Sequence, residues 1–233
     1  MKKLLLMAVC LLVGGMTAVC AQTEPADSLR EVMLDGVEVM ATRASKNTPM
    51  AFTNISREEI KKVNFGQDIP YLLSMTPGAI TTSDAGAGIG YTTLRVRGTD
   101  ATRINVTANG IPVNDAESHA VFWVNLPDLA SNVKDVQVQR GVGTSTNGAG
   151  AFGASINMQT GGLSTLPYAE VSGSAGSFGT LKGTLNVGTG LLNGHWAFDA
   201  RLSHIATDGY IDRASVRLNS YYLQGAWYGG NTN

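Results

Sequence analysis

The stretch from Asp135 to Thr160, DVQVQRGVGTSTNGAGAFGASINMQT, raises the first question about this chain. Its Gly148-x-Gly150-x-x-Gly153 spacing matches a dinucleotide-binding fingerprint, and Glu170 lies 22 residues after Gly148. Such a site needs a helix that opens at the third glycine and faces a phosphate. Residues 154–160 instead alternate as ASINMQT before Gly-Gly, which predicts a strand. We therefore expect a strand-loop-strand unit whose glycines allow positive φ and close backbone approach.

The N-terminal residues indicate export. Two lysines precede an apolar run and a stretch of small residues, MKKLLLMAVCLLVGGMTAVCA, which is typical of a secretory signal peptide cleaved after Ala21. A buried N-terminal helix and a lipoprotein modified at Cys20 are weaker alternatives. The only cysteines, Cys10 and Cys20, lie inside this segment, so we expect neither disulfides nor thiol chemistry in the mature chain.

The composition narrows the class of protein. The chain has 17 basic and 18 acidic residues, and the basic ones are scattered, so a nucleic-acid partner has no support. Glycine accounts for 28 of 233 residues and charged residues for 15%. No internal stretch reaches the roughly 18 apolar residues of a spanning helix. An exported chain of this kind suggests secreted β-structure or an outer-membrane barrel.

Residues 22–44 form a polar leader with one short alternating segment. In LDGVEVMAT, residues 34–42, the apolar Val37, Val39 and Ala41 alternate with Glu38 and Met40. This pattern favours a strand, but the leader offers nothing for it to pair with. We expect it either to be disordered or to join the edge of a partner's sheet.

Residues 45–163 predict a small mixed α/β domain. Ser56 and Glu59 form a capping box ahead of a first helix, and Asp68 with Pro70 predicts a second helix that runs to Pro77-Gly78. LPDLASNV predicts a further turn of helix. Strands are expected in the alternating segments TLRVRG, RINVTANG, DVQVQRG and SINMQT, all after the two helices.

Residues 164–233 predict longer antiparallel strands at 168–175, 180–188, 196–206 and 215–227. In the third strand, Trp196, Phe198 and Leu202 alternate with polar residues, which suits a transmembrane barrel and equally a soluble sandwich. Several aromatic residues gather near strand ends, as in the girdles of barrels. Four strands cannot close a barrel, so we expect the N-terminal part of a longer protein.

The stretch LRVRGTDATRINVTANGIPVN, residues 94–114, together with residues 133–160, resembles the plug domain of TonB-dependent outer-membrane receptors. The positions that match the motifs of that family fall in order: Arg97, Gly98, Arg103, Asn109, Gly110, Pro112, Arg140, Gly141, Gly148 and Gly153. Val142, Asn147 and Ala154 depart from the usual residues of the family loop. The resemblance implies an α+β plug domain, a small mixed sheet with short helices, followed by the first strands of a transmembrane β-barrel.

This resemblance also implies a function. A receptor of this family binds a scarce nutrient at the cell surface and imports it across the Gram-negative outer membrane, gated by its plug and driven by the TonB complex. The expected partners are therefore TonB, outer-membrane lipid and a small ligand: an iron chelate by default, or haem, cobalamin or an oligosaccharide. Val37, Glu38, Val39, Met40 and Ala41 resemble a TonB box. We expect no enzyme, cofactor or metal site.

Other residues receive roles by the same resemblance. Arg97, Arg103 and Arg140 are expected either to pair with carboxylates on the barrel wall or to be ordinary solvated arginines. Two loops, residues 81–91 and 114–123, are expected to face the ligand; their candidate residues are Ser83, Asp84, Tyr91, Asp115, Glu117, His119 and Trp123. Asp115, Glu117 and His119 have a spacing that suits metal ligands, but solvated side chains are the stronger interpretation.

Two competing functions remain at this point. A secreted adhesin or simple pore explains export and the strands, but leaves the helix-bearing domain without a purpose. A nucleotide-binding enzyme ranks third, because the segment after Gly153 predicts a strand and because the chain is exported away from the cytoplasmic cofactor pool.

Overall fold

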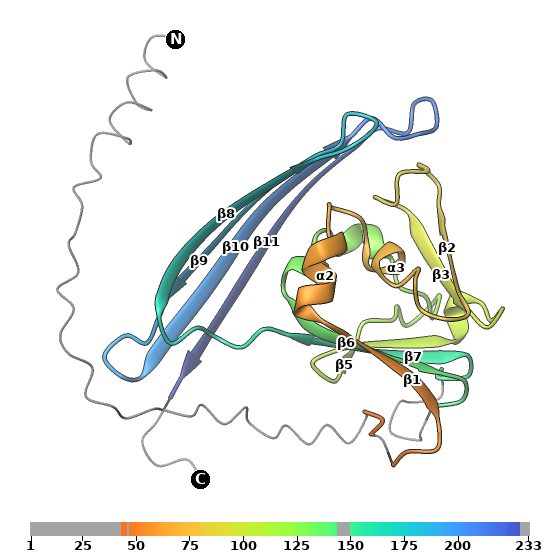
Figure 1. Ribbon diagram of the computed structural model, residues 1–233, viewed down its shortest axis with the longest axis horizontal. Helices are drawn as coiled ribbons and strands as arrows, with labels where there is room; N and C mark the ends of the chain where they lie inside the picture. The colour runs from red at the N-terminus through yellow and green to blue at the C-terminus, as the bar shows by residue number, and fades with distance from the viewer. Residues whose placement is uncertain (1–42, 46, 144–149, 229–233) are drawn as a thin grey trace. The chain divides into compact units, whose positions relative to one another are not determined.

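A five-stranded mixed sheet organises the first part of the chain. The computed structural model describes residues 43–45, 47–143 and 150–228. Within them the sheet has the order β1-β6-β7-β4-β5, and β4 and β7 run parallel while the other neighbours are antiparallel (Figure 1). Its strands are β1 (Ala51–Ser56), β4 (Ile104–Ala108), β5 (Ile111–Pro112), β6 (Val133–Arg140) and β7 (Ala154–Thr160). The predicted mixed sheet with short helices is confirmed.

Short helices and one hairpin complete this domain. The two α-helices are α2 (Arg57–Val63) and α3 (Ile69–Leu72), and the hairpin joins β2 (Ala79–Ser83) to β3 (Thr92–Val96). Three 3₁₀ turns follow: η1 (Ala101–Arg103), η2 (Trp123–Asn125) and η3 (Leu129–Ser131). The capping box at α2 is confirmed, because Ser56 Oγ accepts from the Glu59 N–H and the Ser56 N–H donates to Glu59 Oε2 at 2.7 Å.

The two faces of the sheet differ in chemistry. Alternation in β6 and β7 places Val136, Val138, Ile156 and Met158 in the core. They pack there with residues of α2, α3 and its C-cap, β3, β4, η2 and η3: Ile60, Ile69, Leu73, Leu94, Val96, Ile104, Val106, Trp123 and Ala130. The opposite face presents buried polar residues, among them Gln137, Gln139 and Asn157. The helices are thus fixed on the apolar face alone.

The glycine-rich segment has the predicted strand after it. β7 begins at Ala154, directly after Gly153, and no helix opens there. The Gly153 N–H donates to the Arg103 carbonyl and its carbonyl accepts from the Gly141 N–H, each at 2.8 Å. Gly148 lies outside the described residues. Glycine at 153 is required by space, because a Cβ there would collide with the side chain of Thr99.

Two sequence predictions were wrong in detail. A strand, β1, precedes α2, although AFTNIS shows no clear alternation; main-chain hydrogen bonds to the edge of β6 create it. The second helix ends at Leu72 rather than near Pro77, and Asp68 makes no side-chain cap. Its carboxylate instead accepts from Thr92 Oγ1 at 2.9 Å, which ties the start of α3 to the β2–β3 hairpin.

Four long antiparallel strands form a second, curved sheet with the order β11-β10-β9-β8 (Figure 1). They are β8 (Pro167–Ala175), β9 (Leu181–Thr189), β10 (Trp196–Thr207) and β11 (Val216–Trp227), close to the segments predicted from alternation. No helix among the residues that the structure describes is long and apolar enough to cross a membrane.

This second sheet turns its apolar face to the outside. The register aligns Val171, Leu185, Leu202 and Tyr221 across the four strands, and all four are exposed. The next row consists of small hydroxyl residues, Ser172, Thr184, Ser203 and Ser220, and of these Thr184 and Ser203 are buried. An antiparallel sheet with one apolar and one hydroxyl-lined face has the pattern of a barrel wall that meets lipid on one side and protein on the other.

The contact at Gly153 generates a stability prediction. Gly153→Ala should destabilise the domain by about 1–3 kcal/mol through overpacking against Thr99. Adding Thr99→Gly should recover part of the loss. Gly150→Ala is the matched control, since a Cβ at that position meets nothing within 4 Å. Amide hydrogen exchange of residues 97–103 and 153–158 measures the effect. Equal exchange rates in Gly153→Ala and Gly150→Ala would contradict the prediction.

Asp68 generates a pH prediction. Burial raises the pKa of Asp68 to about 6 against the opposing hydrogen bonds of Thr92 and the Gly90 N–H, compared with an ordinary value of 3.8. Because the folded state holds the proton more tightly than the unfolded state, stability should fall as pH rises from 4 through about 6. Asp68→Asn should abolish this decline, worth at most about 3 kcal/mol. The readout is hydrogen exchange of residues 84–92 from pH 4 to 8, corrected for intrinsic rates; an identical pH profile in the variant would refute it.

Candidate functional site

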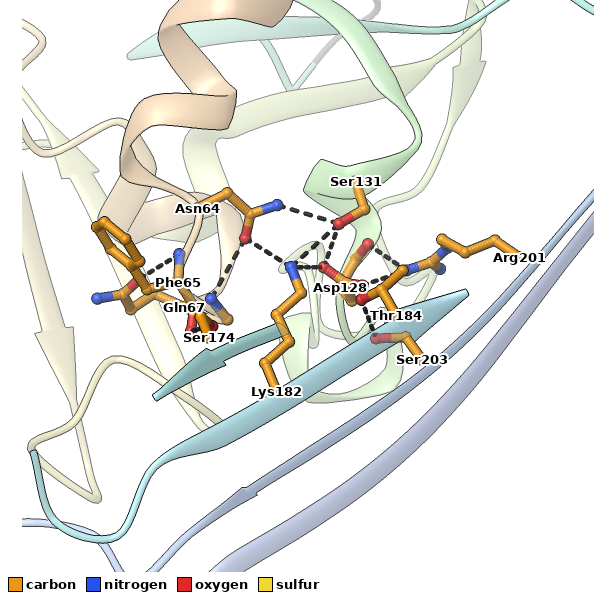
Figure 2. A network of polar contacts seen from close by, with 11 residues as sticks. Asn64, Phe65, Gln67, Asp128, Ser131, Ser174, Lys182, Thr184, Arg201 and Ser203 are labelled. Atoms are coloured by element: carbon orange, nitrogen blue, oxygen red, sulfur yellow. Dashed lines mark hydrogen bonds and ion pairs between the residues drawn. The ribbon is translucent and has the colours of Figure 1, made fainter. Parts of the chain in front are cut away.

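The candidate site is centred on Asp128, in the turn between η2 and η3. Asp128 follows Pro127 and adopts a left-handed conformation, with φ 53° and ψ 26°. Aspartate and asparagine tolerate this region better than most residues. The turn directs the Asp128 carboxylate toward β9 and β10, where two basic side chains meet it (Figure 2).

Two cations and two hydroxyl groups bind this carboxylate. Lys182 Nζ on β9 lies 2.6 Å from Asp128 Oδ1, and Arg201 Nη1 on β10 lies 2.6 Å from Oδ2. The same Arg201 nitrogen donates to the Asp128 carbonyl at 2.7 Å. Ser131 Oγ donates to Oδ1 at 2.6 Å and Thr184 Oγ1 to Oδ2 at 3.3 Å. One carboxylate thus ties the first domain to two neighbouring strands.

All three charged side chains are buried. The side-chain exposure is 0% for Asp128, 7% for Lys182 and 4% for Arg201. Removing such groups from water is costly, and their mutual attraction offsets this cost only while the geometry holds. Losing one partner leaves the others buried and unpaired, which costs on the order of 3–5 kcal/mol. The three side chains therefore depend on one another and form one latch between the first domain and the strands. We call Asp128, Lys182 and Arg201 the Asp128 latch.

The surroundings of Asp128 favour its charged form. Burial by itself raises the pKa of Asp128, but the charge of Lys182 and the hydrogen bonds from Lys182 and Ser131 outweigh it, so the pKa is lowered. A lowered folded-state pKa means that the latch stabilises the fold above the ordinary carboxylate range. This contribution is lost only as pH falls through the lowered value.

The latch also reaches α2. Lys182 Nζ donates to Asn64 Oδ1 and to Ser131 Oγ, both at 3.1 Å, and Asn64 is the C-terminal cap of α2. Beside it, a cavity of about 280 Å³ lies between α2 and strands β8 and β9. Charged side chains on its wall include Arg57, Lys61, Glu170 and Lys182. Lys182 of the latch therefore lines a cavity that has several charged side chains on its wall.

Two other contacts join the strands to the first domain. Gln224 Nε2 on β11 donates to the Gly161 carbonyl at 3.3 Å and to Asp199 Oδ2 at 3.4 Å. Beyond the end of β10, the N–H of Tyr210 donates to the Ala85 carbonyl at 2.9 Å. A Cβ on Gly86 would lie 2.9 Å from the Cβ of Tyr210, so the loop before β3 fits closely against this residue.

The motif arginines lie elsewhere. Among the described residues, none of the ion pairs involves Arg97, Arg103 or Arg140. Arg140 Nη1 donates instead to the Pro77 carbonyl at 3.3 Å. The ion pairs of the Asp128 latch have the reverse polarity, with the carboxylate on the first domain and the cations on the strands. Pairing of the three arginines with further wall strands stays a prediction.

The remaining motif residues shape turns. Asn109 and Gly110 have φ of 52° and 80°, which is the geometry of a two-residue hairpin turn between β4 and β5, and Pro112 ends β5. Gly98 and Gly141 also have positive φ, at 78° and 106°. A Cβ on Gly141 would lie 3.3 Å from Arg97 Nη1. These positions therefore serve backbone geometry.

The loop residues proposed to face a ligand divide into two groups. Tyr91 is 62% exposed and Asp84 is exposed, whereas Ser83 Oγ accepts from the Gly88 N–H at 3.1 Å. Trp123 is only 5% exposed and belongs to the core cluster, so its predicted position toward a ligand was wrong. The apolar ring of Trp123 packs in the core. The sequence shows only that this residue lies in a loop, and not that its side chain is buried.

Asp115, Glu117 and His119 form a turn. Asp115 Oδ2 accepts from the N–H groups of Ser118 at 2.7 Å and Glu117 at 3.2 Å, and the His119 N–H donates to the Asp115 carbonyl. The hydrogen bonds of Ser118 lower the pKa of Asp115. Within the described part of the chain, no group of three or more metal-binding side chains is present. The TonB-box candidates, residues 37–41, lie outside the described residues.

The arrangement defines a class of protein. A small mixed-sheet domain is latched to the polar face of an antiparallel sheet whose other face is apolar, which is the organisation of a plug against the inner wall of a membrane barrel. Residues 44–155 match the family model described as TonB-dependent Receptor Plug Domain. Residues 44–155 are therefore similar to the plug domain of these receptors, and the strands that follow resemble the start of the barrel of such a receptor.

Solved structures share this fold. The pyoverdine outer-membrane receptor FpvA from Pseudomonas aeruginosa PAO1 has 20% identity and a TM-score of 0.64, covering 78% of this chain and 26% of its own. The ferric yersiniabactin uptake receptor FyuA from Yersinia pestis has 16% identity and a TM-score of 0.58, covering 76% and 29%. The alcaligin outer-membrane receptor FauA from Bordetella pertussis has 16% identity and a TM-score of 0.58, covering 77% of this chain and 29% of its own.

This chain thus spans less than a third of the length of these receptors. No curated protein sequence matches it.

The Asp128 latch generates a prediction. Asp128→Asn keeps the left-handed backbone and removes only the charge, so it should speed hydrogen exchange in residues 123–133 by leaving Lys182 and Arg201 unpaired. In a double-mutant cycle, Lys182→Met should cost less when combined with Asp128→Asn than it does alone. Asp84→Asn, on an exposed loop, is the control. Additive effects of the two latch substitutions would show that the pair is not coupled.

Proposed function

We propose that this protein is an outer-membrane TonB-dependent receptor that binds a scarce nutrient, by default an iron chelate, at the cell surface and imports it to the periplasm. The observation that carries the proposal is the plug fold latched through Asp128 onto a wall with an apolar outer face. The similar structures are receptors for pyoverdine, ferric yersiniabactin and alcaligin, which supports the choice of an iron chelate as the ligand.

A plug that fills a barrel must move or partly unfold before a ligand can pass. The energy for this step is proposed to come from TonB, which pairs with Val37, Glu38, Val39, Met40 and Ala41 in the leader. A strand added to the edge of a partner's sheet gains main-chain hydrogen bonds along its length, so it can carry tension without a deep pocket. The segment ends two residues before Arg43, where the described plug begins.

The remaining plug residues have proposed structural parts in this function. Turns at Gly98, Asn109-Gly110 and Gly141 set the backbone of the plug. The exposed loop around Asp84 and Tyr91 is proposed to face the ligand, because it lies against Tyr210 in the loop that joins β10 to β11. The fold gives no support to a simple adhesin, since the latched plug domain has no purpose there.

A proline substitution tests the leader. Val39→Pro in the full-length protein should abolish uptake of the ligand while surface binding is retained, because proline removes a main-chain donor from the added strand. Ser28→Pro, earlier in the leader, is the matched control and should leave uptake unchanged. Radiolabelled ferric chelate measures binding on de-energised cells and uptake on energised cells. Uptake at wild-type rate in Val39→Pro would disprove the assignment of the box.

A further inference from the structure

The outward, apolar face of the four long strands carries a polar pair. His204 on β10 and Asn219 on β11 are directly opposed, and His204 Nδ1 lies 2.7 Å from Asn219 Oδ1. Both side chains are exposed, and they share the outward face with the neighbouring apolar pair, Leu202 and Tyr221. Polar side chains are costly on a surface that meets lipid, and those that occur there mark functional positions.

Two glycines open a hollow beside this pair. In the register of the sheet, His204 is opposite Gly183 on β9, and Gly183 is opposite Gly173 on β8. A Cβ on Gly183 would meet nothing within 4 Å, so the space above this position is open. The hollow has a volume of about 520 Å³, and the apolar side chains that line it are Val171, Leu185, Leu202 and Tyr221. It therefore has an apolar side and, at His204 and Asn219, a polar end.

The polar end lies close to one boundary of the apolar band. Trp196 and Trp227 are opposed at the far end of the same two strands, where an aromatic girdle is expected. The strand from Trp196 to His204 is about 26 Å long at roughly 3.3 Å per residue. A tilt of about 40° reduces this length to about 20 Å across the membrane, and the apolar band of such barrels is about 25 Å tall. The pair therefore lies at the depth where lipid headgroups begin, on the side of the loop that joins β10 to β11.

The charge beside the hollow is positive. Arg217 on β11 is the next outward residue beyond Asn219, toward the same boundary, and its side chain is exposed. None of the ion pairs among the described residues involves Arg217. The carboxylates of these strands, Glu170 and Asp199, lie on the inner face and line cavities against the first domain. Within the described strands, the outward face thus has one cation and no carboxylate, which suits an anionic group.

We propose that the hollow over Gly183 binds one anionic, phosphate-bearing lipid of the surrounding membrane. The phosphate group binds the guanidinium of Arg217 and the amide N–H groups of Asn219. His204 is a positioning residue, because its bond to the Asn219 oxygen leaves the amide donors for the anion. One acyl chain lies in the hollow against Leu202.

A lipid is the occupant that matches this arrangement. The cation and the amide lie at the boundary and the apolar side lies deeper, which is the order of a lipid headgroup and its chains, and basic sites at this depth hold lipid headgroups. The proposal rests on the proposed function only for the membrane around the strands. It goes beyond that function, because the lipid is bound and is not transported.

Native mass spectrometry of the detergent-purified, full-length receptor with added lipid tests the site. Phosphatidylglycerol is the anionic probe, and phosphatidylcholine with the same acyl chains is the zwitterionic comparison. The wild type should bind its first phosphatidylglycerol more tightly than its first phosphatidylcholine. Arg217→Gln should weaken the first phosphatidylglycerol by about fivefold and leave phosphatidylcholine unchanged. Arg95→Gln, exposed on β3, is the matched control and should bind like the wild type.

Two further variants separate the parts of the site. Gly183→Leu fills the hollow without a collision and should remove the tight first phosphatidylglycerol although Arg217 is still present. Ala169→Leu, exposed on the same face of β8 and outside the hollow, is its control. His204→Leu should reduce the preference for phosphatidylglycerol and leave phosphatidylcholine binding unchanged, because the Asn219 amide loses the bond that orients it. An unchanged preference in this variant would remove His204 from the site.

The outcomes distinguish this site from other uses of the face and from the proposed function. Equal affinity of the wild type for the two lipids would overturn the lipid site, and so would unchanged phosphatidylglycerol binding in Arg217→Gln and Gly183→Leu. A receptor dimer that Gly183→Leu abolishes would also overturn it, since the face would then join two copies of the chain. A receptor that inserts into phospholipid vesicles without lipid preference refutes the site alone. Failure of the wild type to insert into vesicles would count against the outer-membrane receptor itself.

Discussion

The fold depends on placing a carboxylate where water cannot reach it and supplying its counter-charges from another sheet. Asp128 is fully buried, and neither Lys182 nor Arg201 has an alternative carboxylate among its ion pairs in the described residues. The three charges are buried where the two sheets meet, and there each of them depends on its partners from the other sheet.

The Asp128 latch and the ion pair between Arg43 and Asp135 hold different parts of the plug. The Asp128 latch acts near α2, η3 and the wall, on the apolar side of the plug sheet, and holds the body of the plug. The ion pair between Arg43 and Asp135 lies at the polar face and holds the start of the described plug. Its two charged side chains are 20% and 24% exposed, unlike the buried latch. Water therefore competes for the Arg43–Asp135 ion pair far more effectively than for the Asp128 latch. The two contacts differ in strength because their surroundings differ.

Local patterns predicted much of this architecture. Alternation located β6, β7 and the four long strands, the capping box located α2, and the segment after Gly153 correctly predicted a strand instead of a nucleotide-binding helix. The strand β1 was not predicted because edge pairing is non-local. The segment AFTNIS becomes a strand by pairing with β6, about 80 residues away in the chain. Trp123 was misplaced for the same reason, because only the folded core shows that a loop tryptophan is buried. The latch was missed because alternation puts Lys182 and Arg201 on a polar face without revealing which carboxylate they meet.

The inner row of Ser172, Thr184, Ser203 and Ser220 gives the wall a further property. Short hydroxyl side chains project little and exchange one hydrogen-bond partner for another, water included, at small net cost. A surface of this kind has shallow relief. At this row the plug is held by the ion pairs of the Asp128 latch and by the hydrogen bond from Thr184 to Asp128. Exchanging one hydroxyl partner for another costs far less than breaking a buried ion pair, so the ionic contacts set the position of the plug on the wall.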